Sequence, residues 1–180
     1  MQFHRVPQPS RERMVPASGH PLVVGVVPGQ SELVALTAAA WADALGDVPL
    51  FFAFVDRSRI VDEEYPDGTV RHTDLDPDQV DESWRQRDKR IRDFLARTLD
   101  GHRGRWEFRY LAGRPDRALT HLARAVDASA IVVGARHPSG VERLREFMAE
   151  SVALHLSRHQ HRPVIIVPVA VVDWKAPAPW

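Results

Sequence analysis

Residues 128–169 read ASAIVVGARHPSGVERLREFMAESVALHLSRHQHRPVIIVPV, and this stretch decides the fold. It holds a short β-branched run at Ala130–Gly134, an amphipathic stretch that ends near His159, and a second apolar run at Pro163–Val172. Short apolar runs bounded by turn residues are typical of strands buried on both faces. The stretch between the two runs has apolar residues at helical spacing. The segment therefore predicts a strand, a helix and a second strand, as in a parallel sheet.

The same alternation continues toward the N-terminus. Strands are predicted at Pro21–Val27, Pro49–Val55 and Trp106–Leu111, and helices at Ser31–Leu45, Asp78–Asp100 and Pro115–Val126. Five strands separated by helices predict an α/β fold in which helices cover both faces of a parallel sheet. In such a sheet, ligands bind at the carboxyl ends of the strands, where the strand order reverses.

Individual residues add detail to these elements. The helix at Ser31–Leu45 is marked by apolar residues at helical spacing, namely Leu33, Leu36, Ala40, Trp41 and Ala44. The polar segment Arg57–Asp78 contains Pro66, Gly68 and Pro77, and predicts a long loop. Its length points to a function, because loops beyond about 12–15 residues are uncommon in compact domains. Pro168 cannot donate to a sheet ladder, so the last strand is expected to lie at an edge or to bulge there.

The composition excludes several classes of function. Lys and Arg together number 24, as do Asp and Glu, which gives a formal net charge of zero. A chain with this balance has no overall attraction to nucleic acid or to an anionic membrane. The absence of cysteine rules out thiolate catalysis, disulfides and cysteine-ligated metal centres. The longest uncharged apolar stretch, Leu33–Ala42, is too short to span a bilayer. We therefore expect a cytoplasmic protein with neither a membrane nor a nucleic-acid partner.

The two ends of the chain differ from its middle. Residues 1–20 are rich in Pro, Ser, Gln and Arg and lack the apolar core of a secretory signal. Such a segment buries too little apolar surface to offset the entropy of ordering, and the Pro-rich C-terminal end has the same character. We expect a flexible N-terminal tail at 1–20, one domain at 21–172 and a C-terminal tail at 173–180.

The order of these motifs resembles the universal stress protein family. Its C-terminal half pairs a strand ending in V-V-G or V-M-G with a glycine-containing loop, a helix containing G-S-V, and a closing strand of P-V-x-x-V form. Ala130–Gly134 and Pro163–Val167 look like these strands, and Gly113-Arg114-Pro115 looks like the family's G-x-P turn. The resemblance covers Pro21–Val172. It implies an adenine-nucleotide-hydrolase-like sheet in the order 3-2-1-4-5 and a homodimer formed through the last strand, Val164–Val172.

Some members of this family bind ATP and others do not. The binders carry G-x-x-G, then nine residues, then G followed by Ser or Thr, because glycines let backbone N–H groups approach phosphate oxygens. In this chain Gly134 takes the first position, and Gly140 matches a further glycine often found in the loop. The second motif glycine falls on His137, whose Cβ hinders a close approach, and Pro138 removes an N–H group.

The rest of the nucleotide pattern is also incomplete. If three extra residues are allowed, Ser151-Val152 match the end of the motif, with Glu150 in place of the glycine. The acidic residue that the family places after the first strand, toward the adenosine, is replaced by Val27 or Pro28. Arg136 and His137 add positive charge that favours an anion. The candidate nucleotide-binding residues are therefore Val27, Pro28, Val55, Gly134, Arg136, His137, Gly140, Ser151 and Val152.

Two groups of residues allow more than one interpretation. His155 and His159 are four residues apart on a helix, which suits a metal ion, but no acid lies nearby in sequence. A cationic helix C-terminus favoured by the helix dipole is the other interpretation. Arg136 and His137 form either an anion or acid–base site or a solvated loop.

The resemblance implies a regulatory module of the stress response. The departures from the nucleotide pattern favour a non-catalytic protein that requires no cofactor and acts as a homodimer, with further protein partners. The alternative is a sensor that binds ATP or AMP with Gly134–Ser151. An enzyme of a related nucleotide-handling fold would carry a serine-glycine-glycine loop or an H-I-G-H signature, and Val27–Ser31 (VPGQS) has neither.

Overall fold

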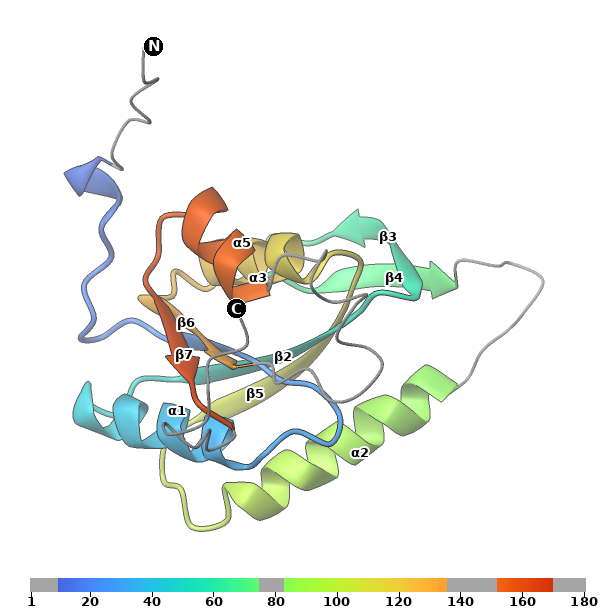
Figure 1. Cartoon of the computed structure of the whole chain (residues 1–180), viewed down its shortest axis with the longest axis horizontal. Helices are drawn as coiled ribbons and strands as arrows, with labels where there is room; N and C mark the ends of the chain where they lie inside the picture. Colours follow the sequence, from blue (N-terminus) through green and yellow to red (C-terminus); the bar gives the residue numbers. More distant parts are fainter. Residues whose placement is uncertain (1–9, 75–82, 136–151, 170–180) are drawn as a thin grey trace, which may run out of the picture.

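The computed structural model describes residues 10–74, 83–135 and 152–169 of the chain. Its centre is a five-stranded parallel sheet in the order β5-β2-β1-β6-β7 (Figure 1). The strands are β1 (Leu22–Gly25), β2 (Leu50–Asp56), β5 (Trp106–Ala112), β6 (Ala130–Gly134) and β7 (Val164–Val167). In chain order this sheet reads 3-2-1-4-5, so the predicted fold and strand order are confirmed.

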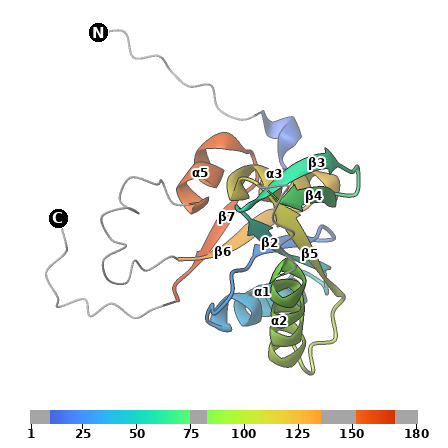
Figure 2. The same cartoon turned by 90° about the vertical axis from the view of Figure 1, so that its right-hand side faces the viewer.

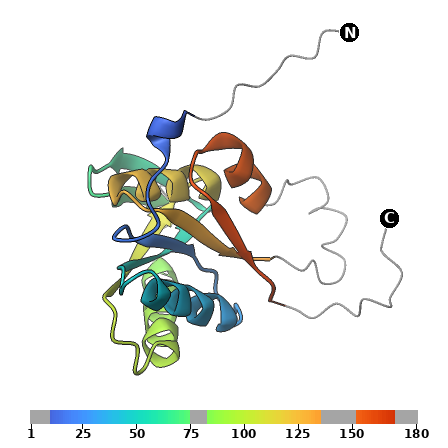
Figure 3. The ribbon, with the colours of Figure 1, turned by 90° about the vertical axis from the view of Figure 1, so that its left-hand side faces the viewer.

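Helices lie on both faces of the sheet, as Figure 2 shows. On one face are α1 (Leu33–Ala44) and α2 (Ser83–Thr98), and on the other are α3 (Pro115–Ala125) and α5 (Val152–His159). A short 3₁₀ helix, η1 (Arg11–Arg13), precedes the sheet and lies beside the turn from α5 into β7 (Figure 3). No helix in these described ranges is long and apolar enough to cross a membrane.

The middle strand, β1, is buried on both faces. Leu22, Val23 and Val24 are each at most 1% exposed. Because successive side chains of a strand point to opposite faces, Leu22 and Val24 join the core under α1 and α2, whereas Val23 joins the core under α3. Burial of each such side chain contributes about 1.5–3 kcal/mol. This strand therefore requires a helical layer on each side.

The residues that α1 buries are not those whose spacing marks the helix in the sequence. Its buried residues are Val34, Ala35, Ala38, Ala39 and Ala42. Of the predicted set, Leu33, Leu36 and Trp41 are 50%, 41% and 48% exposed. The helix has apolar residues nearly all round, so spacing alone does not choose a face. Alanine takes the inner side because its small side chain lets the helix axis approach the sheet closely.

The segment predicted as a loop at Arg57–Asp78 contains a β-hairpin, so that prediction is wrong for the described residues. Strands β3 (Arg59–Glu64) and β4 (Val70–Asp74) pair antiparallel. The turn between them is Tyr65-Pro66-Asp67-Gly68-Thr69. Its Pro-Asp-Gly sequence is typical of a tight turn between two strands, but the same residues are also common in long loops. Backbone hydrogen bonds close it from Tyr65 N to Thr69 O and from Gly68 N to Tyr65 O, both at 2.9 Å.

The prediction that the last strand lies at an edge is confirmed. Strand β7 ends at Val167, directly before Pro168, and pairs only with β6 among the described strands. It is shorter than predicted, and residues 170–172 of the predicted strand lie outside the described residues.

Gly68 offers a test of how tightly the hairpin packs on α3. Its φ is +83°, and a Cβ there would lie 2.8 Å from Leu122 Cδ1 and 3.0 Å from Ala125 Cβ. Gly68→Ala is therefore expected to lower the free energy of unfolding by about 2–4 kcal/mol, from backbone strain and overpacking together. Urea denaturation measures this loss.

Gly46→Ala is the matched control. Gly46 has a φ of +94°, but apart from its chain neighbours no described residue has an atom within 4 Å of the added Cβ, so this position has the strain without the contact. We expect this variant to lose only about 1 kcal/mol. Equal losses in the two variants would show that the hairpin does not press on α3.

Candidate functional site

The candidate site lies at the carboxyl ends of β1, β2 and β6. The strand order reverses at β1, which has β2 on one side and β6 on the other. β1 and β6 pair in register from Leu22↔Ala130 to Gly25↔Val133, so their carboxyl ends lie side by side. This position is where open parallel sheets bind ligands.

The structure brings together some of the predicted residues. Val27 and Pro28 follow β1 and are exposed, and Gly134 is the last residue of β6. Val55 and Val152 pack instead into the core on the α3 and α5 face. Arg136, His137, Gly140 and Ser151, which carried the predicted phosphate contacts, lie outside the described residues.

Gly134 has a packing role in this arrangement. A Cβ at this position would lie 3.0 Å from Val34 Cγ2 in α1 and 3.1 Å from Val169 Cγ1. These contacts are tighter than nearly all real Cβ contacts. The glycine therefore lets α1 and the end of β7 approach the tip of β6, whether or not a phosphate lies above it.

Gln30 joins the two strand ends, and the sequence prediction missed it. Its Oε1 accepts a hydrogen bond from the Val27 backbone N–H at 3.0 Å, and its Cδ lies 4.0 Å from the Cβ position of Gly134. Its Nε2 is buried and has no hydrogen-bond partner among the residues that the structure describes. An unsatisfied buried donor costs about 1–3 kcal/mol, so an acceptor on a ligand would be favoured here. No sequence pattern marks a single glutamine as such a donor.

Asp56, the last residue of β2, is the centre of a second polar group that the sequence did not predict. Its carboxylate is 5% exposed and accepts hydrogen bonds from four donors. These are the Ser58 backbone N–H at 2.9 Å, the Ser58 hydroxyl at 2.6 Å, Arg87 Nη1 at 2.5 Å and the Tyr110 hydroxyl at 2.5 Å. Burial acts to raise the pKa of Asp56, but the hydrogen bonds from Ser58 and Tyr110 and the charge of Arg87 outweigh it and lower the pKa.

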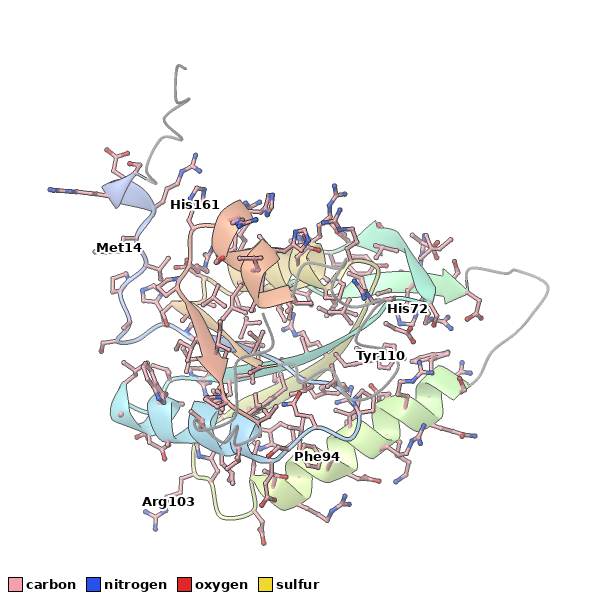
Figure 4. All side chains as sticks on the ribbon, in the orientation of Figure 1. Met14, His72, Phe94, Arg103, Tyr110 and His161 are labelled. Carbon is pink, nitrogen blue, oxygen red and sulfur yellow. The ribbon has the colours of Figure 1, made fainter. Side chains whose placement is uncertain are left out.

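The hairpin contributes its own charged and aromatic groups to this region. Arg59 is 6% exposed, donates from Nε to His72 Nδ1 at 2.7 Å, and forms an ion pair with Asp74. The rings of His72 and Tyr110 each lie close to Trp84 of α2, with centroids 5.1 and 5.6 Å away. Figure 4 shows His72 and Tyr110 between β4 and α2. Burial lowers the pKa of His72, and the charge of Arg59 acts in the same direction.

The metal interpretation of the histidines gains no support from the geometry. His155 and His159 lie with ring centroids 5.5 Å apart, but His159 Nδ1 is 2.9 Å from the backbone oxygen of His155. Within residues 10–74, 83–135 and 152–169, no three His, Cys, Asp or Glu side chains gather closely enough to hold a metal ion.

Comparisons with known proteins agree with this architecture. A family model described as the universal stress protein family matches residues 20–168. No curated protein matches the chain significantly.

Solved structures resemble the fold at low sequence identity. The universal stress protein UspA from Lactobacillus plantarum is 17% identical, with a TM-score of 0.59 over 84% of this chain and 99% of that one. A universal stress protein from Archaeoglobus fulgidus, solved in complex with dAMP, is 20% identical, with a TM-score of 0.56 over 82% and 97%. A universal stress protein in complex with cAMP is 21% identical, with a TM-score of 0.54 over 84% and 98%.

The buried His72 predicts a pH dependence of stability. Its pKa is lower in the folded than in the unfolded protein, so its contribution is present above the unfolded value and is lost as the pH falls. We expect the free energy of unfolding to decrease between about pH 7 and pH 5, with this histidine contributing at most about 1.4 kcal/mol per pH unit. His72→Asn, which keeps an acceptor for Arg59, should flatten this slope. His159→Asn changes an exposed histidine and should leave it intact; identical slopes for both variants would contradict the assignment.

Proposed function

Because this chain belongs to the universal stress protein family, we propose that it is a non-catalytic regulatory module of the stress response that binds an adenine nucleotide only weakly. The nucleotide would bind at the carboxyl ends of β1, β2 and β6. Two similar structures were solved with dAMP and with cAMP, which supports this class of ligand. The single observation that carries the proposal is the buried Nε2 of Gln30, a donor that finds no acceptor among the described residues.

Binding should be weak because the described strand ends offer no free carboxylate to a ribose. A ribose is held best by a carboxylate that accepts from its hydroxyl groups. After β1 the chain has Val27 and Pro28, which offer no carboxylate. Asp56, at the end of β2, already accepts from Ser58, Arg87 and Tyr110, so its lone pairs are occupied. In the described part of these strand ends, a nucleotide would meet an amide donor but no free acid.

The environment of Asp56 and Tyr110 supports the proposal that the protein is not an enzyme. General acid–base chemistry needs a group with a pKa near the working pH and access to the substrate. The pKa of Asp56 is lowered and that of the Tyr110 hydroxyl is raised, both away from neutrality, and the two groups are buried and bonded to each other. They act as a structural pair that ties β2 to β5.

Val27→Asp tests the nucleotide proposal as a gain of function. Val27 is 50% exposed, so the substitution costs little packing. Calorimetric titration with AMP should give a dissociation constant near or above about 1 mM for the unmodified protein and a value at least about fivefold lower for Val27→Asp. Val27→Asn has a similar shape without the charge and should change little.

Three outcomes would count against the proposal. Micromolar binding of AMP by the unmodified protein would favour the sensor alternative, in which the nucleotide pattern is functional despite its departures. An unchanged affinity in Val27→Asp would place the nucleotide elsewhere. Turnover of ATP above the uncatalysed rate would overturn the non-catalytic assignment.

The regulatory module is also proposed to be a homodimer formed through β7. This strand lies at the sheet edge, and Ile166 within it is 53% exposed. An open apolar edge is a template for pairing with a second chain.

Sedimentation velocity should therefore show a dimer that Ile166→Lys converts to a monomer, because a charge on the paired edge would have to be buried. Ile60→Lys makes the same change at an exposed residue of the hairpin and should leave the dimer intact. A monomer at all concentrations, or dissociation by both variants alike, would refute the β7 interface.

A further inference from the structure

A groove of about 670 Å³ lies at the amino ends of β1, β6 and β7, at the opposite end of the sheet from the candidate nucleotide site. Its walls come from three parts of the chain that are far apart in sequence. They are the N-terminal segment with η1, the end of α3 with the turn after it, and the turn between α5 and β7. The lining includes Arg13, His20, Arg124, Asp127, His161 and Arg162. Figure 4 shows His161 above β7 and Met14 on the facing N-terminal segment.

One side of the groove holds a neutralised pair of charges. The Asp127 carboxylate lies 3.2 Å from His20 Nδ1 and 3.3 Å from Arg162 Nη2. The Arg162 side chain is 13% exposed and also donates from Nε to the Ala128 backbone oxygen at 2.5 Å. Asp127 and Arg162 therefore satisfy each other, and they fix the position of the turn that precedes β7.

The other two guanidinium groups have no carboxylate partner in the described part of the chain. Arg13 Nη1 lies 2.5 Å from His161 Nε2. A guanidinium can only donate, so His161 Nε2 is the acceptor in this pair and brings no negative charge to Arg13. Arg124, on the other side of the groove, has no hydrogen bond or ion pair with any described residue, and its charge acts on the nearby Arg162.

The remaining acid in the lining, Glu12, is exposed to solvent, as are Arg13 and Arg124, so water screens the charges of all three. Three arginines thus face two acids, and one of the acids is already engaged. Guanidinium groups bind phosphate oxygens through paired, charge-assisted hydrogen bonds. An oxyanion between Arg13 and Arg124 would give both groups the negative partner that they lack.

We propose that this groove is a binding site for a small multivalent oxyanion of the phosphate type, held by Arg13 and Arg124. The anion bridges the N-terminal segment and the end of α3, so its binding also orders η1 against the sheet. This site is independent of the proposed nucleotide site, because it uses the amino ends of the strands and residues that the nucleotide proposal does not involve.

Titration calorimetry of the full chain with sodium pyrophosphate, at constant ionic strength set with sodium chloride, tests the proposal. The unmodified protein is expected to bind with a dissociation constant below about 1 mM. Arg13→Gln and Arg124→Gln should each weaken binding at least about fivefold, since each removes one charge-assisted contact. Orthophosphate should bind more weakly than pyrophosphate because it carries less charge.

Arg103→Gln is the matched control, because Arg103 is exposed on the loop between α2 and β5 (Figure 4) and the substitution removes the same charge. It should change the affinity less than about twofold. Equal losses of affinity in all three variants would show that the effect comes from net charge alone and would contradict the proposal. No heat of binding at about 10 mM pyrophosphate would also overturn it.

Two further measurements separate this site from the nucleotide site. Pyrophosphate should bind with the same affinity in Val27→Asp and in the presence of excess adenosine, which has the nucleoside but no phosphate to occupy the groove. Competition by adenosine would place the pyrophosphate at the carboxyl ends of the strands and contradict the inference. Pyrophosphate should also slow amide hydrogen exchange in residues 11–16, and unchanged exchange there would contradict the bridging role of Arg13.

Discussion

The burial of β1 on both faces is the constraint on which the rest of this structure depends. Leu22, Val23 and Val24 are almost completely enclosed, so the sheet needs a helical layer on each side. These layers are α1 and α2 on one face of the sheet and α3 and α5 on the other. Ligand chemistry is then left to the two ends of the strands and to the open edge at β7.

Asp56 determines which polar groups the carboxyl end of the sheet can offer to a ligand. A carboxylate that is 5% exposed must be satisfied by donors, since an unpaired buried charge costs several kcal/mol. Its partners come from three elements: Ser58 before the hairpin, Arg87 in α2 and Tyr110 in β5. The same hydrogen bonds that fasten α2 and β5 to the end of β2 therefore remove the nearest acid from ligand binding. Stability and a weak nucleotide site have one physical cause here.

The sequence predicted the features that depend on periodicity and missed those that depend on contacts. The short apolar runs identified all five strands of the main sheet, and the family resemblance supplied their order. The buried face of α1 was missed because Leu33 and Trp41 are as apolar as the alanines that pack inward. The sequence does not predict the hairpin, because Pro66 and Gly68 are as typical of an open loop as of a turn between two strands.

The same distinction between periodicity and contacts applies to the site residues. The sequence predicts Val27 and Pro28 at the end of the first strand, and in the structure both follow β1, which ends at Gly25, earlier than predicted. Gln30 and Asp56 were not predicted, since their roles depend on a backbone N–H group and on an arginine in another element. The groove around Arg13 joins residues more than 100 positions apart, and only the folded chain brings them together.

Strand β7 connects the parts of the molecule to which functions are assigned. Its amino end follows His161 and Arg162 of the anion groove, and its carboxyl end pairs with Gly134 at the nucleotide site. The Ala135 backbone N–H donates to the Val167 oxygen at 2.7 Å, which fixes this end against the tip of β6. A strand of four residues is about 13 Å long, so both proposed ligands would lie next to the edge proposed for the dimer.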